Sequence, residues 1–174
     1  MKLGILTISD SVPIGKRVDT SGPKIKEVLS PFFGLVEYAV CNDDISQIVK
    51  NINQMMKTVT LLVTNGGTGL MERDNTGEAL SVIPGTRLKP LERAISAAMI
   101  LSCGPMSAIS SPVVLKNGAQ YIITLPGRTD EVAAALEGVI KPFALAHIIF
   151  GTDGQIKHAH STPIKGFSDT KVAF

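Results

Sequence analysis

The feature that most limits what this chain can fold into is an apolar segment, residues 61–63, that leads through one threonine into the glycine-rich turn NGGTG at 65–69. Three glycines within four positions let the main chain turn sharply and come close to a ligand, because no Cβ stands in the way. Consecutive N–H groups in such a turn form a concave, partly positive surface suited to phosphate or another anion. An alternative stays open, because glycine-rich turns after strands are common and most of them bind nothing.

Charged residues beside the turn favour a ligand site. Glu72, Arg73 and Asp74 follow it closely, and a plain connection between two elements does not require them. Residues 75–80 read as the start of a helix, whose N-terminal dipole is expected to add to the same anion site. The turn is not a Walker loop, since no Lys-Ser or Lys-Thr pair closes it, and it is not a GxGxxG fingerprint.

Strand and helix patterns alternate over the first half of the chain. Residues 2–9, 35–40 and 59–64 are short apolar runs typical of buried strands. Between them a helix is predicted from Ser21, with the serine as its cap, and an amphipathic helix over 45–56 after the capping residues 42–44. This β-α-β-α-β order predicts a parallel sheet with helices on its faces.

The loops that follow these strands are expected to form a single site. In open sheets of this kind, ligands bind outside the carboxyl ends of the strands. Residues 9–19, 42–44 and 65–74 each follow a predicted strand, so all three segments should project from one edge of the sheet.

The second half of the chain predicts a different pattern. Residues 90–101 have helical spacing, and two strands at 110–115 and 121–125 flank a Lys-Asn-Gly turn that indicates a hairpin. A long apolar helix is predicted after Pro126-Gly127, kinked or divided at Pro142. Residues 151–174 lack periodicity, so the expected organisation is one domain over 1–150 and an irregular tail or partner-binding strap over 151–174.

Composition excludes several classes of protein. At 174 residues, with 44% hydrophobic and 18% charged residues, the chain suits one globular domain rather than a disordered polypeptide. A net charge of +2 and the absence of tryptophan argue against nucleic acid as a partner. We expect a cytoplasmic protein that does not cross a membrane, because no signal peptide or long apolar run is present. Cys41 and Cys103 share no metal-ligand spacing and are interpreted as reduced core thiols.

The residue types near the predicted site favour phosphoryl or nucleotidyl transfer. All three histidines lie at or after position 147, which argues against a histidine-based triad; His158 and His160 could bind a metal, but such a pair in a tail more often binds nothing. Carboxylates, hydroxyls and main-chain amides remain, and positioning with charge neutralisation is what phosphoryl transfer needs. Asp43 and Asp74 could hold Mg²⁺ directly or through water. The alternatives are a helix cap for Asp43 and an exposed loop acid for Asp74.

Taken together, these residues resemble the MogA/MoaB-type family of molybdenum cofactor biosynthesis over roughly residues 1–150. The segments that carry the resemblance are, in chain order, Ile8-Ser9-Asp10, Asp19-Thr20-Ser21-Gly22, Asp43-Asp44, Gly66-Gly67-Thr68-Gly69, Arg73-Asp74, Thr76, Glu78-Ala79 and Leu125-Pro126-Gly127.

The resemblance implies a three-layer α/β/α fold with a mostly parallel sheet, usually trimeric, that binds the dithiolene pterin molybdopterin. Enzymes of this family use Mg-ATP to attach AMP to the terminal phosphate of the pterin and release pyrophosphate. By resemblance, therefore, the chain is expected to be a molybdopterin adenylyltransferase with ATP as co-substrate, Mg²⁺ as cofactor and a molybdenum-insertion protein as a further partner.

The resemblance also assigns roles to individual residues. Asp43 and Asp74 match the two essential acids of the family: Asp74 is expected beside the pterin and its phosphate, and Asp43 near Mg-ATP, holding Mg²⁺ directly or through water. The implied binding residues are Gly66, Gly67, Thr68 and Gly69 around anionic groups, Ser9, Asp10, Ser21 and Gly22 on the nucleotide side, and Pro126 with Gly127.

The chain departs from the family pattern at Asn65, Gly77, Ser111 and Arg128. Two other functions therefore remain open at this stage. One is a non-catalytic pterin-binding or scaffold protein with the same fold. The other is a nucleotide-processing enzyme related to the competence-damage family.

Overall fold

The apolar runs of the sequence form a mixed sheet in the computed structural model, which describes residues 1–72 and 74–150. Within this part of the chain the sheet has six strands in the order β2-β1-β3-β6-β5-β4. The strands are β1 (Lys2–Ile8), β2 (Leu35–Cys41), β3 (Leu61–Asn65), β4 (Thr86–Arg87), β5 (Val114–Asn117) and β6 (Gln120–Leu125). The first four strands in the sheet order pair in parallel, and β5 and β4 add an antiparallel edge.

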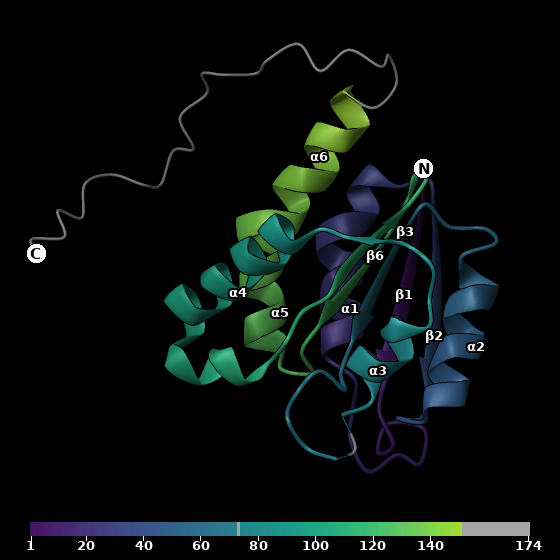
Figure 1. Cartoon of the computed structure of the whole chain (residues 1–174), viewed down its shortest axis with the longest axis vertical. Coiled ribbons are helices and arrows are strands. Elements are labelled where there is room, and N and C mark those ends of the chain that lie inside the picture. The colour runs from purple at the N-terminus through teal and green to yellow at the C-terminus, as the bar shows by residue number, and fades with distance from the viewer. Residues whose placement is uncertain (73, 151–174) are drawn as a thin grey trace, which may run out of the picture.

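Helices cover both faces of the sheet, so the expected three-layer α/β/α fold is confirmed (Figure 1). In Figure 1, α1 (Ser21–Leu29), α4 (Lys89–Cys103) and α5 (Thr129–Ala135) lie on one side, and α2 (Ile45–Met55) and α3 (Thr76–Ser81) on the other. The remaining segments are η1 (Ser30–Phe32), η2 (Pro105–Ile109), η3 (Leu136–Ile140) and α6 (Lys141–Phe150). No helix in the described part of the chain is long and apolar enough to cross a bilayer.

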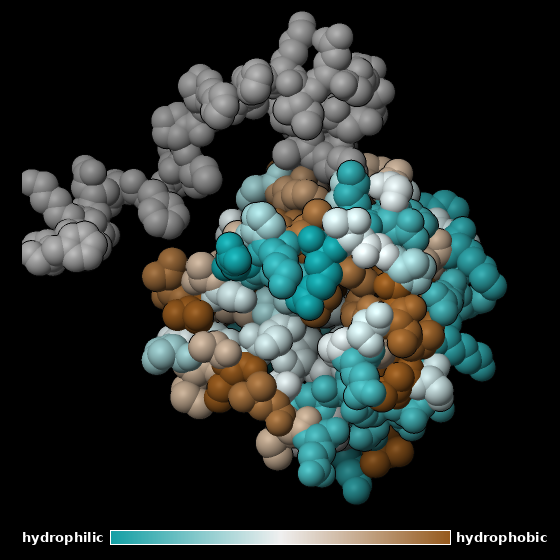
Figure 2. All heavy atoms as spheres, in the orientation of Figure 1, coloured by the Kyte–Doolittle hydropathy of each residue, from teal (hydrophilic) through white to brown (hydrophobic). Residues whose placement is uncertain are grey.

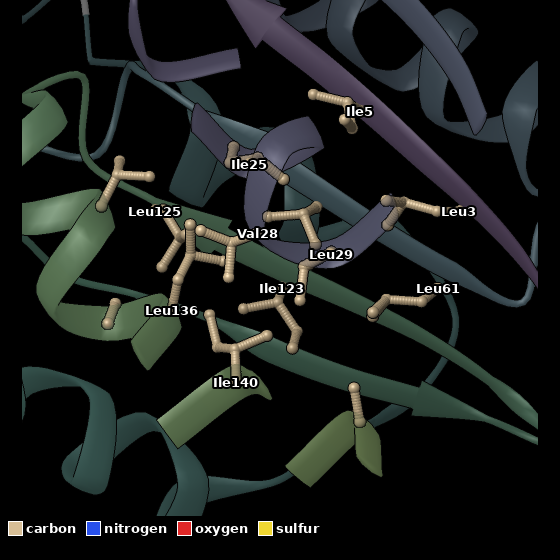
Figure 3. Close-up of a cluster of buried hydrophobic side chains, with 14 of the residues drawn as sticks. Leu3, Ile5, Ile25, Val28, Leu29, Leu61, Ile123, Leu125, Leu136 and Ile140 are labelled. Carbon is tan, nitrogen blue, oxygen red and sulfur yellow. The ribbon is translucent and has the colours of Figure 1, made fainter. Parts of the chain in front are cut away.

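Two apolar clusters hold the helices to the sheet. Alternate residues of a strand point to opposite faces, so Leu61 and Val63 pack on the α1 and α5 side while Leu62 packs against α2 and α3. Figure 3 shows the first cluster, in which Val28 and Leu29 of α1 meet residues of β3, β6 and the segment after α5. Because β3 is buried along its whole length, its carboxyl end is fixed in position, and the glycine-rich turn begins there.

The structure confirms the predicted hairpin but shortens its first strand. Residues 110–113, predicted as strand, precede β5, and the amide of Ser111 donates a hydrogen bond to the Thr68 carbonyl at 3.0 Å. The segment before β5 is therefore drawn toward the glycine-rich turn instead of extending the sheet.

The long helix is divided at Pro142, as predicted. The helix passes through the π-helical segment η3, and α6 begins at Lys141, immediately before Pro142. The predicted tail at 151–174, with His158 and His160, lies outside the described residues.

The two cysteines differ in environment. Cys41 is buried, as predicted, and burial, followed by the charges of Asp43 and Asp44, raises the pKa of its thiol to about 11. Cys103, the last residue of α4, is only partly buried, so its prediction as a core thiol is wrong. Neither cysteine forms a disulfide with the other.

The start of α1 is fixed by Asp19 rather than by the predicted serine cap. Oδ1 of Asp19 accepts hydrogen bonds from the amides of Ser21 and Gly22, both at 3.0 Å. Oδ2 accepts from the hydroxyls of Thr7, at 2.5 Å, and Tyr38. Ser21 is itself the first helical residue, and its hydroxyl donates to the Gly127 carbonyl at 3.0 Å. One carboxylate thus joins α1 to β1 and β2.

These contacts set the ionisation of Asp19. Burial opposes the charged form, but the hydrogen bonds from Thr7, Tyr38 and the two amides outweigh it, so the pKa of Asp19 lies below its ordinary value of 3.8. A carboxyl group with a lowered folded-state pKa stabilises the fold fully above its unfolded pKa and loses that effect as the pH falls through the folded pKa.

We therefore predict a pH-dependent stability loss for Asp19→Asn. The variant keeps the side-chain shape but lacks the charge, so its free energy of unfolding near pH 7 should fall by about 1 to 2 kcal/mol. The difference from wild type should shrink as the pH drops below 3.8. Urea unfolding of both proteins at neutral and acidic pH measures this.

Glu27→Gln is the matched control for this measurement. Glu27 lies on the same helix but is exposed and forms a surface pair with Lys24, so its replacement should change stability by less than about 0.5 kcal/mol at either pH. An Asp19→Asn deficit of equal size at both pH values would contradict the assignment.

Candidate functional site

The three loops predicted to converge do so at the carboxyl edge of the parallel strands. They surround a cavity of about 440 Å³, and the loops lie at the lower edge of the sheet in Figure 1. The segment after β1, the turn after β3 and the segment after β6 all line it, as do residues of η2 and α5. The convergence follows from the parallel pairing of β1, β3 and β6, which places their ends side by side.

The glycine-rich turn is held in a shape that only glycine allows. Gly66 and Gly67 have φ angles of +100° and +61°, in the region that disfavours residues with a Cβ. A Cβ on Gly66 would lie 2.1 Å from the Ile8 carbonyl oxygen, and one on Gly67 would lie 2.4 Å from Oγ1 of Thr76. The glycines therefore permit close contact with β1 and α3 as well as with the cavity.

The carbonyl groups of residues 66–68 accept hydrogen bonds from the protein, whereas three amides of the turn have no acceptor among the described residues. The Gly66 carbonyl accepts from Oγ1 of Thr76, the Gly67 carbonyl from the Thr76 amide, and the Thr68 carbonyl from the Ser111 amide. Within the described residues, the amides of 67–69 donate to no protein acceptor, and all three residues line the cavity. Adjacent unpaired donors of this kind suit an anion.

The N-terminus of α3 does not add to this anion site, so that prediction is wrong. The first amide of the helix, at Thr76, is used by the Gly67 carbonyl. The helix has six residues, and none of them lines the cavity. The main-chain donors available to a ligand therefore come from the turn itself.

Asp43 and Asp74 both line the cavity and lie against the turn. A Cβ on Gly67 would be 2.8 Å from Oδ1 of Asp43, and one on Gly69 would be 2.6 Å from Oδ2 of Asp74. Asp43 is held from several sides: its amide donates to Asp10, and its Oδ1 accepts from the Asn75 amide at 3.3 Å. Oδ2 of Asp74 accepts from the Met71 amide at 2.8 Å.

The alternative role of Asp43 as a helix cap is wrong. The cap of α2 is Asp44, whose Oδ1 accepts from the Gln47 amide at 3.0 Å. Asp44 carries a lowered pKa because of its hydrogen bonds from Ser46 and Gln47. The Asp43 side chain is therefore not needed to begin the helix.

The charge of the cavity wall favours a cation-bound anion over a bare one. Among the described residues, five carboxylates and two arginines line it, namely Asp10, Asp19, Asp43, Asp74, Glu131, Arg17 and Arg128. Arg128 is already paired with Asp130 through two hydrogen bonds, and this pairing raises the pKa of its guanidinium. A polyphosphate entering this acidic cavity would need a counter-ion near its phosphates.

The donor set at the cavity fits Mg²⁺ better than a metal held wholly by protein. No group of three or more His, Cys, Asp or Glu residues in the described part of the chain could hold a metal ion. Mg²⁺ is commonly bound by one or two carboxylates together with waters and substrate phosphates. Asp43 and Asp74, on the two sides of the turn, match that pattern.

The remaining predicted binding residues divide into those that reach the cavity and one that does not. Ser9, Asp10, Ser21, Thr68, Pro126 and Gly127 line it. Gly22 is outside the lining, and a Cβ there would lie 2.5 Å from Oδ2 of Asp19 and 2.8 Å from Oγ1 of Thr7. Gly22 therefore makes room for the Asp19 carboxylate, and its place on the nucleotide side stays a prediction.

Two of the departures from the family pattern have structural partners. The side-chain amide of Asn65 lies 3.0 Å from the Thr7 hydroxyl. Ser111 is anchored through its main chain to Thr68, while the hydroxyl of the preceding Ser110 lies 2.6 Å from that of Thr68. The turn is thus held to its neighbours by hydroxyl and amide groups.

The sequence reasoning missed three sets of cavity residues: Asp19, Glu131, and the pair Met106 and Ile109. Asp19 lies within a recognised segment but was given no role. Glu131 could have been found as an acid on an apolar stripe, because it precedes the buried Ala135 by one helical turn. No local pattern marks Met106 or Ile109, which reach the cavity through the fold of η2.

Comparison with known proteins supports one family. Residues 4–146 match the family described as "Probable molybdopterin binding domain". A Dictyostelium discoideum protein named gephyrin is 34% identical over 84% of this chain, which spans only 22% of that protein's length. A protein of Pyrococcus furiosus named molybdopterin adenylyltransferase is 30% identical, covering 78% of this chain and 83% of its own.

A solved structure supports the same family. The molybdopterin biosynthesis enzyme MoaB from Thermus thermophilus has a TM-score of 0.72 and 33% identity, over 84% of this chain and 95% of its own. The fold, the match along most of the sequence and the glycine-rich turn with its two acids show that this chain belongs to the MogA/MoaB-type family of molybdenum cofactor biosynthesis proteins.

Proposed function

We propose that the protein transfers AMP from Mg-ATP to the terminal phosphate of molybdopterin and releases pyrophosphate. The observation that carries this proposal is the set of three amides at 67–69 that have no acceptor within the described part of the chain, in residues that line a cavity flanked by Asp43 and Asp74. The cavity volume of about 440 Å³ also falls within the usual range for small-molecule sites. The name of the P. furiosus relative supports the same reaction.

In this reaction an oxygen of the pterin phosphate attacks the α-phosphorus of ATP. The bond from that phosphorus to the pyrophosphate oxygen breaks, and pyrophosphate leaves with the electron pair. Mg²⁺, when bound, neutralises part of the phosphate charge. The amides of the turn hold anionic oxygens in place, and Asp43 and Asp74 are the groups that would hold the metal, directly or through water.

The proposed reaction makes a prediction for Asp74. Asp74→Asn removes a negative charge beside the turn, so pyrophosphate release from Mg-ATP and molybdopterin should fall by at least about 100-fold. A coupled pyrophosphate assay with both substrates saturating measures it. Glu72→Gln is the matched control, because Glu72 is an exposed acid of the same loop that does not line the cavity; it should keep wild-type activity.

The outcomes separate the proposed reaction from its rivals. Tight binding of molybdopterin without AMP transfer by wild type would favour a scaffold role. Release of pyrophosphate or phosphate from a nucleotide without any pterin would indicate a different nucleotide-processing enzyme. An Asp74→Asn variant that keeps more than half of the wild-type rate would refute the role given to Asp74.

The proposed reaction also makes a prediction for the glycine-rich turn. Gly67→Ala places a methyl group where Asp43 and Thr76 now lie, so the affinity for Mg-ATP should fall by about tenfold or more, equivalent to about 1.4 kcal/mol. Isothermal titration calorimetry measures this affinity directly.

Gly118→Ala controls for the backbone strain of that substitution. Gly118 has a similar φ of +58°, but nothing lies within 4 Å of its Cβ position, and it is in the β5–β6 hairpin. Both variants bear the same left-handed strain, and only Gly67→Ala displaces groups of the cavity. Equal nucleotide affinities for the two variants would contradict the prediction.

A further inference from the structure

One carboxylate of the cavity wall has no part in the proposed reaction. Glu131, in the first turn of α5, is only 4% exposed and lines the cavity on the side of η2. Its Oε1 accepts a hydrogen bond from the buried Ser107 hydroxyl at 2.8 Å. Nη1 of Arg128 lies 3.9 Å from the same oxygen. The side chain is thus held in one place by a neighbour on another helix.

The second oxygen of Glu131 has no partner within the described residues. No hydrogen bond within the described residues involves Oε2. In this part of the chain, the Thr64 hydroxyl is the single fully enclosed side-chain nitrogen or oxygen atom that lacks a partner. Oε2 is therefore not fully enclosed, and the cavity that Glu131 lines is where it can meet a ligand donor.

Apolar side chains stand beside this carboxylate. Met106 and Ile109 belong to η2, the same short helix as Ser107, and both line the cavity. They are 64% and 42% exposed, respectively, and hydrophobic residues gather over the end of α4 and η2 at the left of Figure 2. Apolar walls beside a fixed polar group are the usual composition of a site for a flat ring.

We propose that Glu131 is a specificity-determining residue that binds the edge of an aminopyrimidinone ring, with the ring against Met106 and Ile109. Such an edge carries an amino group next to a ring N–H, and these two parallel donors match the two oxygens of a carboxylate. This inference rests on the proposed function, in which the pterin of molybdopterin supplies that ring.

The alternative ring in the same reaction fits Glu131 less well. Adenine offers one amino group beside a ring nitrogen that only accepts hydrogen bonds, so its edge would set an acceptor against a carboxylate oxygen. A site built to bind a donor rejects an analogue that lacks it, because buried polar groups are then left unpaired. Glu131 therefore assigns the η2 side of the cavity to the pterin and leaves the remainder to the nucleotide.

The test compares two rings that differ at one position. Pterin-6-carboxylate carries an amino group at C2, whereas lumazine-6-carboxylate carries an oxygen there, and both rings are fluorescent. Fluorescence titration of the full chain, without nucleotide, gives the ratio of their dissociation constants. Wild type should bind the pterin about tenfold more tightly or better, and Glu131→Gln, which keeps an oxygen for Ser107, should bring the ratio to about one.

Glu137→Gln is the control, because Glu137 follows two turns later, is exposed and pairs with Lys141; its ratio should equal that of wild type. A merely structural role for Glu131 would weaken both rings equally and leave the ratio unchanged, which would overturn the inference. Failure of wild type to bind either ring, or to discriminate between them, would also overturn it. AMP transfer without ring discrimination would refute this inference alone, and ring discrimination without AMP transfer would refute only the proposed reaction.

Discussion

The close contact between the main chain at Gly66 and the carbonyl of Ile8 is the constraint on which the rest of the site depends. A side chain at position 66 would overlap that oxygen at 2.1 Å, so the turn can leave β3 alongside β1 only if the residue is glycine. The path then brings the carbonyls of 66–68 to Thr76 and Ser111. Since these acceptors are occupied by protein donors, the amides of 67–69 remain for the cavity. Sheet pairing and ligand chemistry thus share one stretch of backbone.

The carboxylates around this backbone have two different roles. Asp19 is occupied by four protein donors and joins α1 to β1 and β2, which makes it a structural carboxylate despite its place in the cavity wall. Asp43 and Asp74 lie against the turn instead. Four donors use the lone pairs of both Asp19 oxygens, so this carboxylate has little capacity left to bind a ligand.

Much of the fold could be predicted because its signals are local. Apolar runs predicted β1 and β3, the spacing of Ile48 and Ile52 predicted α2, and parallel topology predicted the convergence of the loops.

The predictions were wrong where the role of a residue depends on partners that are distant in the sequence. Ser21 has the chemistry of a cap, but its hydroxyl donates a hydrogen bond to the Gly127 carbonyl. At position 22, a Cβ would overlap the Asp19 carboxylate. The spacing along α5 marks Glu131 as an acid on an apolar stripe, but its contact with Ser107, which lies 24 residues away, is not visible in a local pattern.

The order of the strands along the chain determines which part of the cavity wall is synthesised last. The cavity wall combines segments near the N-terminus with Gly127, Arg128 and Glu131, and the hydroxyls of Thr20 and Thr129, 109 residues apart in the chain, lie 2.6 Å from each other. Gly127, Arg128 and Glu131 follow β6, which pairs with β3. A nascent chain that ends at α4 therefore lacks this part of the cavity wall.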